Sequence, residues 1–127
     1  MTAQVHALVG SSVVIVSLLV GVWALVSARR SANPSIALTV GALVGTAILT
    51  IQVLIGADLW FRVGARPIAG PLAYVHMSGP ILALAGAIFH VFGPAKNRVR
   101  NYAIGMLSIT GLGLLSYVIG EIGHSMR

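Results

Sequence analysis

Four long apolar runs constrain this chain more than any other feature of its sequence. They cover roughly residues 5–27, 36–59, 72–92 and 102–122. A helix needs about 20 apolar residues to cross the hydrocarbon of a bilayer, and each run meets that length. Hydrophobic residues make up 57% of the chain and charged residues 8%, whereas soluble domains carry about 25% charged residues. The sequence therefore predicts an all-α integral membrane protein with four transmembrane helices.

The stretches between the runs are short and contain glycine, proline and charged residues, which end helices and favour water. They cover residues 29–34, 62–71 and 93–100. Connections this short make consecutive helices antiparallel neighbours. We therefore expect an antiparallel up-and-down bundle that forms one transmembrane domain over residues 1–127. The first run lacks a basic segment before it and is too long for a signal peptide, so we expect it to be retained as a helix.

The lysines and arginines predict how the bundle is oriented. The first and third connections share one side of the membrane and hold five of the eight cations: Arg29, Arg30, Lys96, Arg98 and Arg100. The opposite side holds Arg62, Arg66 and Arg127. Because positively charged loops stay in the cytoplasm, both termini are expected on the outer side of the cytoplasmic membrane of a prokaryote. Short cationic clusters beside apolar runs are typical membrane flanks, which argues against nucleic-acid binding.

Four histidines are the strongest functional signal. Ionisable side chains are rare within membranes and by default mark functional sites. The predicted topology puts His6, His76 and His124 toward the outer face and His90 toward the inner face. Two neutral imidazoles on facing helices can hold a b-type heme without covalent attachment, and the absence of cysteine excludes c-type attachment. We expect His6 and His76 to be the axial iron ligands of one heme b.

Glycines near both histidines support this pair. Gly10 follows His6 by four residues and Gly79 follows His76 by three, so each glycine lies on the same helical face as its histidine. A flat porphyrin needs the volume that these missing side chains leave. Pro80 has no backbone N–H and is expected to widen the pocket by bending its helix.

Polar residues of the second run and the connection after it are further cofactor-binding candidates. Gln52 lies one turn before Gly56 and is expected to hydrogen-bond across helices or to reach a bound group. Arg62 and Arg66 lead into the third helix. They are placed either to pair with heme propionates through charge-assisted hydrogen bonds or to act as ordinary membrane flanks.

Two other ligand sets remain open. His124 is an alternative partner for His76, or else part of a solvated C-terminal tail. His90 lies fourteen residues after His76 and would suit a second heme, but no other histidine reaches the inner side. Met106 is the one plausible thioether ligand there, so a second heme is not expected.

Three segments resemble the histidine-bearing part of heme A synthase and its relatives, over roughly residues 5–90. They are Val5-His6-Ala-Leu-Val-Gly10, Gln52-Val-Leu-Ile-Gly56-Ala-Asp58 and Ala73-Tyr-Val-His76-Met. The resemblance implies a four-helix bundle that holds a heme between His6 and His76 near the outer face, as small four-helix b-type cytochromes also do. This chain has half the length of that duplicated family and lacks a glutamate beside His6, so oxidation of a farnesylated heme is not implied.

Three functional hypotheses follow. The first is a membrane cytochrome that transfers electrons to or from quinol or a partner redox subunit, as a carrier or oxidoreductase subunit rather than a stand-alone enzyme. Ligation by two histidines fills both axial positions, which favours electron transfer. The second is a cofactor-free structural or assembly subunit, with glycine-rich faces that pack against other chains or a second copy. The third is a small proton-coupled transporter, which would need a deeply buried acid, whereas Asp58 and Glu121 lie near helix ends.

Overall fold

The computed structural model describes residues 3–62 and 70–125, except the side chains of residues 3, 62 and 123–125. Four helices account for most of this chain: α1 (Ala3–Ser27), α2 (Ile36–Arg62), α3 (Pro71–Phe92) and α4 (Arg98–Ser125). No strand occurs in the described ranges. Each helix contains a span long and apolar enough to cross a membrane. The prediction of an all-α protein with four membrane-length helices is confirmed.

Local sequence features determine where α3 and α4 begin. Gly70 adopts a φ of 64°, a conformation that favours glycine, and Pro71 then occupies the first turn of α3. At the start of α4, the Asn97 side-chain oxygen accepts a hydrogen bond from the Arg100 amide at 2.9 Å. This N-cap makes α4 begin at Arg98, four residues before the predicted run.

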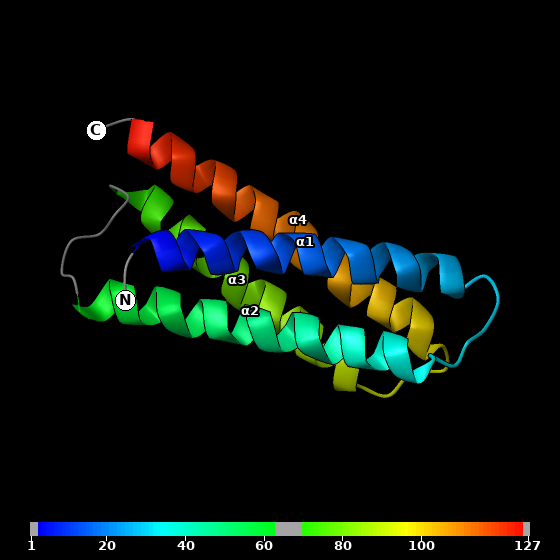
Figure 1. The fold of residues 1–127 in the computed structure, drawn as a ribbon. Coiled ribbons are helices and arrows are strands. Elements are labelled where there is room, and N and C mark those ends of the chain that lie inside the picture. Colours follow the sequence, from blue (N-terminus) through cyan, green and yellow to red (C-terminus); the bar gives the residue numbers. More distant parts are fainter. Residues whose placement is uncertain (1–2, 63–69, 126–127) are drawn as a thin grey trace.

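The helices form a ring of neighbours in which α1 and α3 lie on a diagonal. α4 packs along α3 and α1, α1 packs along α2, and α2 also contacts α3. Among the described residues, the backbones of α1 and α3 do not approach each other. The connections 28–35 and 93–97 lie at one end of the bundle (Figure 1), where the Val99 amide donates to the Ala32 carbonyl at 3.4 Å.

The bundle divides along its length into two regions of different packing. We call the region beside those two connections the packed half, and it comprises residues 17–27, 36–48, 84–92 and 98–108. The region at the other end is the cavity half, and it comprises residues 4–16, 49–61, 71–83 and 109–122.

Glycines bring the helices of the packed half into close contact. A Cβ atom added to Gly21 of α1 would lie 2.9 Å from side-chain atoms of Leu107 in α4. An added Cβ at Gly45 of α2 would lie 3.0 Å from the sulfur of Met106. Gly45 belongs to a GxxxG step, and such steps let membrane helices approach closely. Hydrophobic attraction between helices is weak in lipid, so close van der Waals contact at such glycines helps to hold these helices together.

Large apolar side chains cover the outer surface of the bundle. Leu8, Ile36 and Phe61 are 70%, 85% and 82% exposed. A soluble monomer rarely presents extended apolar surface of this kind, whereas lipid solvates it without cost. The surface is compatible with a bilayer environment, as the apolar sequence predicts.

Candidate cofactor site

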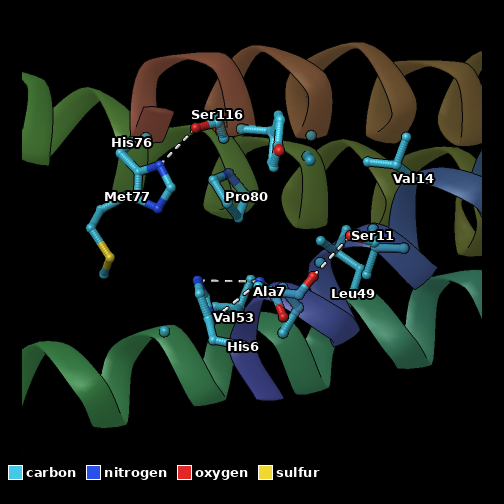
Figure 2. A pocket seen from close by; sticks show the side chains of 18 of the residues that line it. His6, Ala7, Ser11, Val14, Leu49, Val53, His76, Met77, Pro80 and Ser116 are labelled. Carbon is cyan, nitrogen blue, oxygen red and sulfur yellow. Dashed lines mark hydrogen bonds between the residues drawn. The ribbon is translucent and has the colours of Figure 1, made fainter. Parts of the chain in front are cut away.

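A cavity of about 630 Å³ lies in the cavity half and is lined by all four helices. Its volume is within the roughly 300–1,000 Å³ that small-molecule and cofactor sites occupy. Most of its wall is apolar, and the polar groups are few (Figure 2). The wall includes His6, Gly10, Gln52, Gly56, His76, Pro80, Ser116 and Glu121.

The cavity exists because α1 and α4 cross and then diverge. Their crossing is fixed by a 2.9 Å hydrogen bond between the buried hydroxyls of Ser17 and Thr110. One turn further, a Cβ added to Gly113 would lie 3.0 Å from Val14. Beyond this contact, the C-terminal part of α4 splays away from the start of α1 (Figure 1).

His6 and His76 face each other across this gap. Their ring centres are 6.5 Å apart, and the ring planes are inclined by 62°. His6 belongs to α1 and His76 to α3, the two helices of the diagonal. Figure 2 shows the two rings on opposite sides of the cavity. The structure thus brings together the two histidines that the sequence selects, at a place where their helices do not pack.

His76 is held by the backbone of α4. Its Nδ1 lies 2.8 Å from the carbonyl oxygen of Ser116. A carbonyl only accepts, so Nδ1 carries the hydrogen and Nε2 keeps its lone pair. A metal-bound histidine usually donates its other ring N–H to such an acceptor, which fixes the tautomer and the ring orientation. The ring is therefore prepared to bind an electrophilic metal through Nε2.

Gly79 has a different role from the predicted one of leaving room for a porphyrin. An added Cβ there would meet the hydroxyl oxygen of Ser116. Gly79 is buried against α4 and is absent from the cavity wall. It allows α3 and α4 to approach closely, and this approach carries the Ser116 carbonyl to His76. Gly10, by contrast, does line the cavity.

His6 is held by the side chain of Gln52 in α2. The Gln52 amide nitrogen lies 3.2 Å from Nδ1 and 3.3 Å from Nε2 of the ring. Two glycines fit around this pair: an added Cβ at Gly10 would lie 3.0 Å from the Gln52 nitrogen, and one at Gly56 would lie 3.3 Å from His6 Cε1. The Gln52 side-chain oxygen is buried and has no partner among the described residues.

Three predicted candidates fall partly or wholly outside the described residues. Arg66 lies in residues 63–69 and is outside them. The backbones of Arg62 and His124 are helical, but their side chains are outside the described part. Contacts of the two arginines with propionates, and of His124 with His76, stay predictions.

His90 and Met106 lie in the packed half and face different helices, and His90 Nδ1 is buried without a partner among the described residues. His90 packs against α4 at Gly105, where an added Cβ would lie 3.0 Å from His90 Cβ. Met106 is fully buried, and its sulfur faces Gly45 of α2. Consecutive helical residues point about 100° apart, so Gly105 faces α3 while Met106 faces α2.

Ser116 is the site residue that sequence reasoning missed. It holds His76 through its backbone carbonyl. Every residue carries such a carbonyl, so no residue type marks this role in a sequence. Only the register of α3 against α4 reveals it.

Among the described side chains, the carboxylates form no metal site with the histidines. Glu121 is exposed and lines the cavity, and Asp58 is half-buried near the end of α2. Within the described part of the chain, no three His, Asp or Glu side chains gather closely enough to bind a metal ion. Among the described residues, the site offers a pair of imidazoles.

Comparison of this chain with family models, with curated proteins and with solved structures finds no match. The resemblance to heme A synthase stays a prediction from three short motifs.

Proposed function

We propose that this protein is a membrane b-type cytochrome that holds one heme b between His6 and His76 and transfers electrons. One observation carries the proposal: two imidazoles from helices that do not pack against each other meet at 6.5 Å inside a cofactor-sized cavity. Two histidines leave most of the coordination of a bare metal ion to water or other ligands. A porphyrin supplies four equatorial nitrogens of its own and needs only two axial ligands from the protein.

The separation of the two rings fits this ligand class. Two imidazoles that held one metal ion between them, with metal–nitrogen distances of about 2.0–2.1 Å, would have ring centres roughly 6 Å apart. The observed separation of 6.5 Å is close to that value. The bond from His76 to the Ser116 carbonyl leaves the Nε2 lone pair available.

Heme iron with two histidine ligands supplies a one-electron couple and leaves no open position for substrate. The chain would hold the iron through the two rings, surround it with mostly apolar walls, and keep the rings oriented through Ser116 and Gln52. We further propose an antiparallel topology with both termini outside, which puts the site near the outer face of a prokaryotic cytoplasmic membrane. Electrons would then pass to or from quinol or a partner redox subunit.

A reduced-minus-oxidised absorption spectrum of the purified protein tests the proposal. The wild type is expected to show Soret and α bands of heme b, and both His6→Ala and His76→Ala should lose them. His90→Ala is the matched control, because it removes a histidine from the packed half and should keep the spectrum. A colourless wild type would refute the proposal in favour of a cofactor-free subunit, and bands that survive in the His76 variant would refute the assigned ligands.

A further inference from the structure

Gln52 lies beside His6, and only one of the two polar atoms of its amide has a hydrogen-bond partner among the described residues. Its side chain is 9% exposed and its amide nitrogen is near both ring nitrogens of His6. The amide oxygen, in contrast, is buried without a partner among the described residues. Buried polar groups are nearly always paired, so an unpaired one calls for an explanation.

A neutral imidazole has one N–H donor and one lone-pair acceptor. With its nitrogen toward the ring, Gln52 donates to the unprotonated nitrogen of His6. That bond occupies the lone pair that a metal would need. If the amide turns by half a rotation, its oxygen accepts the ring N–H instead and the other ring nitrogen is free. The two orientations have nearly the same shape, and each leaves one buried amide group without a partner among the described residues. They differ in whether a ring nitrogen of His6 is left free for a ligand.

We infer that Gln52 is the positioning residue of His6: its side-chain carbonyl accepts the ring N–H while the other ring nitrogen binds the cofactor. This inference rests on the proposed heme site. An equivalent contact occurs on the opposite side of the cavity, where the Ser116 carbonyl accepts the N–H of His76. His76 is thus held by a backbone carbonyl and His6 by a side chain. The contact to His6 can therefore be changed by substitution of Gln52.

The surroundings of Gln52 keep its amide at the ring. Gly10 and Gly56 bring the backbones of α1 and α2 close to this pair, since an added Cβ at either would lie within 3.3 Å of the Gln52 nitrogen or the His6 ring. On its other side the amide borders the cavity, which leaves it free to rotate about its last torsion. This arrangement suits a group whose task is to fix the tautomer of its neighbour.

The first test compares heme binding and midpoint potential in Gln52→Leu, Gln52→Glu and the wild type. Loss of an outer hydrogen-bond partner typically lowers metal affinity about 10–100-fold, and we expect this for Gln52→Leu. Gln52→Glu should retain binding and lower the midpoint potential, because a carboxylate accepts the N–H more strongly and makes His6 a more basic ligand. Thr46→Val, which removes another buried polar group of α2 outside the cavity, should change neither quantity.

A second readout does not depend on heme. Nitrogen-15 NMR of labelled histidine in the apoprotein should show a single tautomer of His6 in the wild type and a mixture in Gln52→Leu. If Gln52→Leu has the same heme affinity, midpoint potential and His6 tautomer as the wild type, the proposed role of Gln52 is refuted while the heme site stands. Equal losses in Gln52→Leu, Gln52→Glu and Thr46→Val would reduce that role to packing. A wild type without heme would refute the proposed function alone, and the tautomer would still decide whether Gln52 positions His6.

Discussion

Glycines serve different purposes in the two halves of the bundle. In the packed half, Gly21 and Gly45 admit large side chains from α4, and little space remains between the helices. In the cavity half, Gly10 and Gly56 admit a polar pair instead, and about 630 Å³ stays open beside it. The comparison teaches that a glycine in a membrane helix marks close approach, but the neighbour that approaches decides whether the result is packing or a site.

The largest effect is expected where bulk is added to the packed half. Gly21→Leu would force side-chain atoms into Leu107 and its backbone nitrogen, which lie within 3.2 Å of an added Cβ. Overpacking of a core costs about 1–3 kcal/mol and occasionally more, and we expect the upper end here. Thermal unfolding in detergent, followed by circular dichroism, measures the loss.

The control for this variant is Gly111→Leu, which adds the same side chain at an exposed position of α4 with open space around it. It should unfold close to the wild-type temperature. If both leucine variants unfold alike, the contrast in packing that distinguishes Gly21 does not hold in solution.

The second prediction concerns Gly79, which lies in the cavity half but serves packing. Gly79→Ala should destabilise the protein by about 1–2 kcal/mol, because the new methyl group meets the Ser116 hydroxyl. Combining it with Ser116→Ala removes that hydroxyl and should restore most of the stability, while the backbone carbonyl that holds His76 remains. A double-mutant cycle by thermal unfolding gives the coupling. No coupling would mean that Gly79 does not face Ser116.

This glycine also shows where sequence reasoning reaches its limit. Hydropathy and length predict the four helices, and histidine depth within them predicts the His6–His76 pair, because both follow from position along a helix. The role of Gly79 depends on which way its face turns, and a helix that is apolar all round carries little periodic signal to fix this. The register of α3 on α4 arises from steric fit between small residues, which the sequence alone does not determine.

Gln52 and α4 also show which features the sequence predicts and which only the structure reveals. The chain predicts a polar amide in the second helix near a gap, and the structure adds its partner, His6. The start of α4 was predicted at residue 102 from hydropathy, whereas the Asn97 cap begins it at Arg98. Charged residues can be helical where they reach the water beyond the membrane, so a hydropathy boundary is not a helix boundary.

The smallest expected change in stability comes from adding bulk to the cavity half, and it has the opposite sign. Val53 lines the cavity and is partly buried against the core. Val53→Phe should fill part of the open volume and stabilise the apoprotein by about 0.5–2 kcal/mol, as cavity-filling changes commonly do. The same change should lower heme loading, measured by the Soret band per protein. Leu54→Phe, at the neighbouring lipid-facing position that is 64% exposed, should alter neither quantity. If Val53→Phe instead destabilises the protein as Gly21→Leu does, the cavity half is closed in solution and the difference between the two halves disappears.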